Sequence, residues 1–389
     1  MKTRVRIIDT LSYSTFHEMF NASVVYMCML IFHQVELRCS FSTWDNIKLL
    51  LARHRPNADV HAVKYHSVGV VQRDDTWGGL LKYILSGWMN FWHYLLAPRS
   101  CQLVYMNNNP LSLWWVVLAN YVLKKDVAIF CHGELDLLIR RPKVWKPSFF
   151  YKYLFLGMFR YGYVGKHVKM FVLGDSILHN LLPFLNQRNR THFCAVEHPY
   201  FFHEQSCESH ALSLPLKIGT VGTMTEAKGL RNFLKLALQT NPAHVRLSVV
   251  GRVMEPIDFA AYPQVNFLAK GDRFIPRDKY EKGIDALDYI LFLYPTDSYG
   301  LIASGAIFDA LDMGKPIITL TNQYFNHVLR LPVGYVVSSL EELQAVVDDN
   351  CVNLSEAERK YKAFLLNIEQ LKQFFMPETV SVDFQAKLQ

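Results

Sequence analysis

Paired cysteines are missing from this chain. Its seven cysteines are scattered over 389 residues, with no Cys-x-x-Cys motif and no spacing typical of a disulfide framework. Disulfides are rare in the cytoplasm, where thiols are kept reduced. The cysteine usage therefore predicts free thiols in a cytoplasmic protein.

Secretion and membrane-spanning signals are also absent. The N-terminus lacks the apolar core and the cleavage site of a signal peptide, and it enters a predicted strand almost at once. The longest uncharged stretch near it, residues 19–35, is too short and too polar to predict a transmembrane helix. We expect any contact with a membrane to be peripheral.

Two kinds of ligand-binding signature are not found. No Gly-x-Gly-x-x-Gly motif follows the first predicted strand, so little supports a dinucleotide-dependent oxidoreductase. No group of His, Cys, Asp or Glu residues has the spacing of a metal site. The sequence therefore predicts neither a bound metal nor a cofactor.

Acidic residues are scarce in the first half of the chain. Residues 1–200 carry 23 Lys and Arg against 12 Asp and Glu, whereas the remaining residues carry 18 against 22. A half-chain with this excess of positive charge indicates an anionic partner, such as a membrane surface, a lipid phosphate or a nucleic acid.

Three aromatic segments of the basic half favour a membrane over nucleic acid. They are residues 77–98, 111–123 and 143–169, and the last one interleaves six Lys and Arg with nine aromatic residues. Basic residues beside amphipathic aromatics are what a helix needs to lie among lipid headgroups. The alternative for each is a core helix whose charged residues face water. We expect an anionic membrane surface as a partner of 143–169 and leave both interpretations open for the other two.

The order of apolar runs predicts an α/β fold with two doubly wound domains. Six short runs separated by helical segments are followed by a polar connector at 203–215 and by six more runs. This alternation is typical of parallel sheets covered on both faces. The predicted domains are 1–205 and 216–365, and 366–389 is expected to hold the end of a last helix and an irregular tail. The predicted strands are 4–9, 35–41, 60–66, 102–107, 127–132, 168–174, 216–222, 245–251, 265–269, 288–293, 316–320 and 334–337.

One stretch, from Tyr294 to Ile318, is typical of an anion-binding site. The apolar run 288–293 leads through turn residues to Ser304 and Gly305, which open a predicted helix. The first N–H groups of such a helix have no internal partner and lie at the positive end of its dipole, so they suit a phosphate. Asp309 follows one turn later, where a carboxylate can accept hydrogen bonds from ribose hydroxyls.

Four motifs follow one another between residues 216 and 340. They are Val221-Gly-Thr-Met-Thr-Glu-Ala-Lys-Gly-Leu230, Leu247-Ser-Val-Val-Gly-Arg252, Asp288-Tyr-Ile-Leu-Phe-Leu-Tyr-Pro295 and Asp309-Ala-Leu-Asp-Met-Gly-Lys-Pro316. Their order and spacing resemble the donor domain of GT-B fold glycosyltransferases, most closely family 4 (group 1). The resemblance implies two Rossmann-like domains facing a central cleft, with a C-terminal helix that packs back toward the N-terminal domain.

The resemblance also implies roles for residues of the second domain. Lys228 matches the lysine that grips the donor diphosphate, and Asp309 stands where the family has a glutamate that holds the ribose. Thr223 stands in the place of the family's usual arginine, so Arg252 and Arg273 are the candidates to supply the missing charge. The resemblance implies a reaction that retains the configuration of the sugar. Because the family's pair of glutamates is absent, inversion stays open. The predicted donor-binding residues are Gly222, Thr223, Lys228, Arg252, Tyr299, Ser304, Gly305 and Asp309.

The first domain is expected to bind the acceptor at the carboxyl ends of its strands. His132 resembles the family's histidine that contacts the donor sugar, and either His132 or Glu134 could serve as the base of an inverting reaction. A histidine at such a place is more often a structural residue, which is the alternative. The predicted catalytic residues are His132, Glu134 and Lys228, and the predicted acceptor-side residues are Ser14, His17 and Asn21.

Together these observations predict a metal-independent hexosyltransferase that uses a UDP- or GDP-sugar. Its acceptor would be a lipid-linked saccharide or another polysaccharide precursor at the inner face of the plasma membrane. A sugar-nucleotide epimerase or hydrolase with the GT-B fold is one alternative. A non-catalytic sugar-nucleotide-binding protein is another, and it is motivated by Thr223 and by the missing glutamate.

Overall fold

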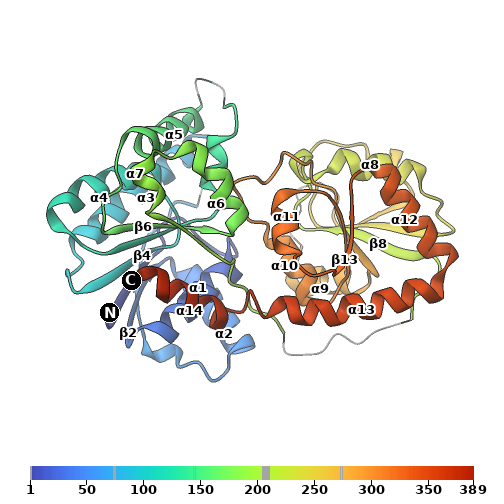
Figure 1. Cartoon of the computed structure of the whole chain (residues 1–389), viewed down its shortest axis with the longest axis horizontal. Helices are drawn as coiled ribbons and strands as arrows, with labels where there is room; N and C mark the ends of the chain where they lie inside the picture. The colour runs from blue at the N-terminus through green and yellow to red at the C-terminus, as the bar shows by residue number, and fades with distance from the viewer. Residues whose placement is uncertain are drawn as a thin grey trace. The chain divides into compact units, whose positions relative to one another are not determined.

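The computed structural model describes residues 2–72, 76–142, 144, 146–203, 211–271, 273 and 275–389. The chain divides into two compact units, each built on one parallel sheet with helices on both faces (Figure 1). The first unit holds Met1–Phe201, Gly300–Ala303 and Phe374–Gln389, and the second holds Phe202–Tyr299 and Ser304–Gln373. The structure confirms the predicted α/β class with two Rossmann-like domains.

The sheet of the first unit has seven parallel strands in the order β3-β2-β1-β4-β5-β6-β7. Every residue of β4 and β5 is buried, as expected for central strands covered on both faces. The strand order reverses direction between β1 and β4, and their carboxyl ends therefore flank the place where such sheets bind ligands. The strands are β1 Arg4–Ile8, β2 Gln34–Cys39, β3 Val63–Ser67, β4 Cys101–Tyr105, β5 Val127–Cys131, β6 Val168–Leu173 and β7 Phe193–Val196.

Two layers of helices cover this sheet. In Figure 1, α1, α2 and α14 lie on one face, and α3, α4 and α5 lie on the other. Among the described residues, no helix combines the length and the apolarity needed to cross a membrane. The helices are α1 Glu18–Ile31, α2 Phe41–His54, α3 Thr76–Leu95, α4 Pro110–Leu123, α5 Pro147–Leu156, α6 Asp175–Leu181, α7 Gln187–Arg190 and α14 Pro377–Leu388.

The sheet of the second unit has six parallel strands in the order β10-β9-β8-β11-β12-β13. Its strands are β8 Leu216–Val221, β9 Val245–Val250, β10 Val265–Phe267, β11 Tyr289–Phe292, β12 Ile317–Leu320 and β13 Gly334–Val337. The helices are α8 Leu230–Gln239, α9 Arg277–Asp285, α10 Gly305–Asp312, α11 Gln323–Val328, α12 Leu340–Val352 and α13 Leu354–Lys372. All twelve predicted strands of the chain occur in the two sheets, and β7 is an additional strand that the sequence analysis missed.

The C-terminal segment differs from the expectation. The irregular tail predicted after the last helix is wrong, because Pro377–Leu388 forms α14. The predicted return to the N-terminal domain is confirmed, since α14 packs against α1 and the Phe384 ring lies 5.2 Å from Phe130 and 4.8 Å from Phe171. Arg55 of α2 also pairs with Glu378, with 2.6 Å between Nε and Oε1. Buried aromatic packing and this ion pair hold the end of the chain on the first unit.

Candidate functional site

Two strand ends of the second unit approach each other closely at the carboxyl edge of its sheet. Gly222 follows β8 with a φ of +82°, and its N–H donates to the carbonyl of Val250 over 3.0 Å. A Cβ at Gly251, after β9, would lie 1.7 Å from the Gly222 oxygen. A Cβ at Gly222 would lie 3.5 Å from Ala306 of α10. Glycine is thus required at these turns, and the turn after β8 faces the first turn of α10.

Helix α10 begins at this edge of the sheet. Among the described residues no side chain caps its N-terminus, because the Ser304 hydroxyl lies 3.2 Å from the Tyr294 hydroxyl instead. A Cβ on Gly305 would meet nothing within 4 Å, so the space beside the helix start is open. Backbone N–H donors and the positive end of the helix dipole are therefore available to an anion there. The predicted helix start is confirmed.

Lys228 places a desolvated ammonium group beside the start of α10. It ends a short 3-10 helix, Glu226–Lys228, and its Nζ lies 5.9 Å from the centroid of the Tyr294 ring and 6.0 Å from that of Tyr299. Burial lowers the pKa of Lys228 to about 8, and the Asp309 carboxylate opposes that shift. Within the described part of the chain, Nζ has no hydrogen-bond acceptor. The side chain is half-buried, and an anionic ligand that pairs with this partly desolvated cation would complete the site.

Asp309 is held by two side chains of α9. Its Oδ2 accepts a hydrogen bond from the Tyr280 hydroxyl over 3.1 Å, and its Oδ1 lies 3.4 Å from Nη2 of Arg277. These contacts orient the carboxylate group. The sequence analysis missed Arg277 and Tyr280, because two residues at the start of a helix carry no motif that links them to a carboxylate about 30 positions later.

Arg252 lies beside the position where the family resemblance would place an arginine. Its Nη2 is 3.5 Å from the Thr223 hydroxyl, and the backbone of Met224 pairs with that of Val253 as an isolated parallel bridge. The ends of β8 and β9 are therefore joined side by side. This geometry brings the Arg252 guanidinium from the end of β9 to the turn after β8. Arg252 must lie there if it is to replace the missing arginine.

The eight predicted donor residues converge on one edge of the second unit. Tyr299 has a left-handed backbone with a φ of +59°, and its ring packs 4.7 Å from Tyr294. Turn glycines, cations, an open helix start and an oriented carboxylate are thus gathered within one unit. Such a set can bind a diphosphate and the hydroxyls of a sugar.

A separate open pocket of about 260 Å³ lies in the first unit, at the carboxyl ends of β1, β4 and β5. Four of the predicted residues line this pocket, namely His17, Asn21, His132 and Glu134. Tyr83 of α3 and Arg140 also line it, and the sequence analysis did not single them out. Nothing in the local sequence of α3 shows that a tyrosine on this helix reaches the ends of the strands.

Glu134 is engaged by the backbone of its own loop. Its Oε2 accepts from the N–H groups of His132 and Gly133 at 2.9 and 3.0 Å, and its Oε1 accepts from the N–H of Asn108 at 2.9 Å. Burial raises the pKa of this carboxyl, and the backbone hydrogen bonds oppose that effect. Three backbone N–H groups hold this carboxylate, so Glu134 fixes the loops after β4 and β5.

His132 lies in a cluster of three histidines. Its ring centroid is 4.1 Å from that of His17 and 5.4 Å from that of His198. Burial lowers the pKa of His132 well below its usual value and lowers the pKa of His198 to about 4. The buried Nδ1 of His132 has no hydrogen-bond partner in the described part of the chain. His132 is therefore a neutral imidazole on the pocket wall with one nitrogen unsatisfied.

The other two predicted acceptor-side residues have structural contacts. Asn21 is buried, and its Nδ2 donates to Oδ2 of Asp9 and to the carbonyl of Phe16, each over 3.3 Å. Ser14 is exposed and does not line the pocket; its N–H donates to the Ser42 hydroxyl over 3.0 Å. Asn21 thus fixes the loop after β1, and Ser14 belongs to the outer surface of that loop.

No protein-family model and no curated protein matches this chain. Solved structures do match it. Sucrose-phosphate synthase from Thermosynechococcus elongatus aligns over 98% of each chain with a TM-score of 0.61 and 11% identity. HepE from Anabaena, crystallised with UDP and glucose, aligns over 99% of each chain with a TM-score of 0.60 and 11% identity.

A third structure, TarM, aligns over 78% of this chain with a TM-score of 0.57 and 12% identity. The chain spans 58% of the length of TarM. All three are glycosyltransferases with the GT-B fold, and the likeness shows that this chain has that fold.

Proposed function

We propose that this chain is a hexosyltransferase that takes a sugar from a nucleotide-sugar donor. The observation that carries the proposal is the Lys228 ammonium, which lies without an acceptor next to the open start of α10 and to the oriented Asp309 carboxylate. The diphosphate would lie on Lys228 and the first N–H groups of α10, and the ribose would lie on Asp309. This arrangement places positive charge where the departing diphosphate gains negative charge.

The reaction is proposed to need no metal ion. Lys228, Arg252 and the dipole of α10 would together neutralise the leaving diphosphate, which is the electrostatic role that a divalent cation plays in other phosphate sites. Arg252 would compensate for the threonine at position 223 from a distance of 3.5 Å.

Retention of configuration is favoured over inversion. An inverting enzyme needs a base for the acceptor hydroxyl, and Glu134 accepts three backbone hydrogen bonds that a protonated carboxyl would accept less strongly. The unsatisfied imidazole of His132 is the other candidate base, and in a retaining reaction it would instead contact the donor sugar.

The acceptor is proposed to be a lipid-linked saccharide or another polysaccharide precursor, bound in the pocket of the first unit. The excess of Lys and Arg in residues 1–200 suits a phosphate-bearing acceptor at the inner face of the plasma membrane. UDP-sugars are the first donors to test, since HepE was crystallised with UDP and with UDP-glucose. GDP-sugars are the second.

Calorimetric titration with UDP- and GDP-sugars tests the donor site. We expect one of them to bind the native chain, and we expect Lys228→Ala to weaken binding by about tenfold or more, because a charge-assisted contact is lost. Lys235→Ala removes an exposed lysine of α8 and serves as the matched control. Equal affinities of the Lys228→Ala and Lys235→Ala variants would remove Lys228 from the site.

A further inference from the structure

Helix α3 has its polar residues inside and its apolar residues outside. Ser86 and Asn90 are 0% and 1% exposed, and both bond to the Thr10 hydroxyl, at 2.7 and 2.8 Å. On the opposite side, Trp88 and Trp92 are 55% and 48% exposed. A helix on the surface of a protein in water has the reverse arrangement. The outward side of α3 therefore suits surroundings other than water.

The exposed apolar residues of α3 form one stripe. Large exposed side chains occur at positions 81, 84, 85, 88, 92 and 95, and this spacing keeps them on one side of the helix. The inward polar contacts to the loop after β1 and to α4 are buried hydrogen bonds, so the helix cannot turn over without breaking them. The stripe is thus fixed in its outward orientation.

Helix α4 extends the stripe into a wider surface. The two helices pack side by side, and the Trp88 ring lies 6.3 Å from Trp115. Leu118 and Val122 of α4 are 57% and 78% exposed. We call the surface formed by Leu81, Leu85, Trp88, Trp92, Leu118 and Val122 the α3–α4 face. Soluble monomers rarely expose a continuous apolar surface of this kind unless it binds something.

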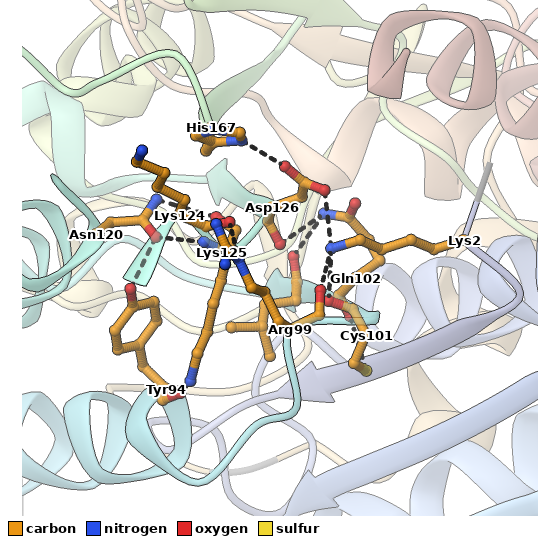
Figure 2. A network of polar contacts seen from close by, with 11 residues as sticks. Lys2, Tyr94, Arg99, Cys101, Gln102, Asn120, Lys124, Lys125, Asp126 and His167 are labelled. Atoms are coloured by element: carbon orange, nitrogen blue, oxygen red, sulfur yellow. Dashed lines mark hydrogen bonds and ion pairs between the residues drawn. The ribbon is translucent and has the colours of Figure 1, made fainter. Parts of the chain in front are cut away.

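Helices α3 and α4 and the segment between them carry charges of one sign. Residues 76–125 contain no Asp or Glu, whereas Lys82, Arg99, Lys124 and Lys125 are all present. Arg99 and Lys124 are exposed at the carboxyl ends of α3 and α4, and Figure 2 shows them side by side, with the Arg99 Nε 3.5 Å from the Lys124 carbonyl. Lys125 is turned inward, where its Nζ donates to the Tyr94 carbonyl over 2.7 Å.

We propose that the α3–α4 face inserts into the headgroup region of an anionic lipid bilayer, with Arg99 and Lys124 on lipid phosphates. Tryptophans and aliphatic side chains would enter the boundary with the acyl chains, as in helices that lie in the plane of a membrane. A bilayer is favoured over a protein partner because fifty consecutive residues contain no carboxylate. Such a segment matches a lipid surface that carries only negative charge. The proposal deepens the membrane location given under the proposed function, and it rests on the first unit alone.

The basic segment 143–169 is less suited to this role than its sequence indicates. The side chains of Tyr151, Phe155 and Phe159 are buried in the first unit rather than presented outward. Lys143 and Trp145 lie outside the described residues. Lys152 donates to the carbonyl of Arg140 over 2.7 Å. Phe150, Tyr153 and Tyr161 of this segment are 58%, 54% and 85% exposed, so it adds charge and a smaller aromatic contact near a membrane.

Vesicle co-sedimentation of the full chain tests the proposal. Vesicles of phosphatidylglycerol and phosphatidylcholine are compared with vesicles of phosphatidylcholine alone. We expect the variant Trp88→Gln, Trp92→Gln, Val122→Gln to bind the anionic vesicles at least about tenfold more weakly than the native chain, because three inserted apolar side chains are lost. The variant Phe41→Gln, Leu49→Gln changes two exposed apolar residues of α2 and should bind like the native chain.

Further measurements separate the alternatives. Arg99→Glu, Lys124→Glu should remove most of the preference for anionic vesicles. Unchanged co-sedimentation of the triple glutamine variant with anionic vesicles would overturn the proposal. Analytical ultracentrifugation that shows a dimer of the native chain and a monomer of this variant would also overturn it. Nucleotide-sugar titration of the triple variant should match the native chain, since the donor residues lie in the second unit. Vesicle binding by a chain that binds no nucleotide sugar would refute the proposed function and leave this inference intact.

Discussion

The hydroxyl of Tyr280 donates a hydrogen bond to Oδ2 of Asp309 over 3.1 Å, and this contact joins α9 to α10. Arg277, one turn earlier on α9, approaches the other oxygen. The carboxylate is therefore fixed in orientation before any ligand arrives. A fixed carboxylate loses little conformational entropy when it binds hydroxyl groups.

Substitution of Asp309 by Ala should weaken nucleotide-sugar binding by roughly 1.5–3 kcal/mol, the range for hydrogen bonds to a charged group. Tyr280→Phe keeps the carboxylate but removes the hydrogen bond from Tyr280, so a smaller loss of about 1 kcal/mol is expected. Calorimetric titration measures both, with thermal unfolding as the control for folding. A folded Asp309→Ala variant with native affinity would rule out the ribose contact.

The activity should fall at alkaline pH. Burial lowers the pKa of Lys228 to about 8 in the free protein, so its ammonium is lost as the pH rises through that value. A diphosphate needs the charged form, and kcat/KM should therefore decline above about pH 8. The measurement is the pH profile of kcat/KM for the native chain and for Lys228→Arg, whose guanidinium stays charged. A native profile that stays level up to pH 10 would argue against this role.

Glu134→Ala should destabilise the first unit. The substitution leaves the N–H groups of Asn108, His132 and Gly133 without their carboxylate acceptor, which should reduce the free energy of unfolding by about 3 kcal/mol. Asp136→Asn is the control, because its partner Arg140 is exposed and surface pairs contribute little. Urea denaturation followed by circular dichroism compares the variants. If Glu134→Ala unfolds like the native chain and loses activity, Glu134 is a catalytic group instead.

The stability of the first unit should decrease in weak acid. His198 is buried and its pKa is lowered to about 4, so between about pH 6.5 and 4 the unfolded chain binds a proton that the folded chain does not. Its contribution is fully present above the unfolded pKa and is lost as the pH falls, by up to about 3 kcal/mol. His198→Asn should flatten the dependence of unfolding free energy on pH in this window. An equally steep dependence in the variant would exclude His198 as its source.

Local sequence patterns were sufficient to predict the sheets. Strand β11, Tyr289–Phe292, and the turn that leads to Ser304 combine a buried apolar run with residues that favour turns and helix starts, so their structure depends little on distant contacts. Strand β7 is as short as β11, β12 and β13, but it lies outside residues 216–340, where the family resemblance helped to locate those three. Helix α14 owes its structure to packing on α1, which its own sequence does not reveal.

Only those residues of the candidate site that lie in motifs along the chain could be predicted from the sequence. Lys228 and Asp309 lie in motifs with a fixed spacing, whereas Tyr280 reaches Asp309 through tertiary packing. The outward position of the apolar side of α3 likewise could not be predicted from the sequence. Periodicity indicates that Trp88 and Ser86 lie on different sides of the helix, but the hydrogen bond between Ser86 and Thr10 is needed to show which side faces inward.

Transfer of a labelled sugar tests the central claim most directly. The native chain is incubated with UDP- or GDP-sugars labelled in the sugar, together with a bacterial lipid extract containing polyprenyl-linked saccharides, and the label is followed into the lipid phase. We expect labelled lipid from one donor with the native chain and with Lys235→Ala, and a loss of at least about tenfold with Lys228→Ala, since transition-state charge stabilisation is removed. Release of free labelled sugar without labelled lipid or polysaccharide precursor would contradict the account and indicate a hydrolase, and donor binding without any turnover would indicate a non-catalytic protein.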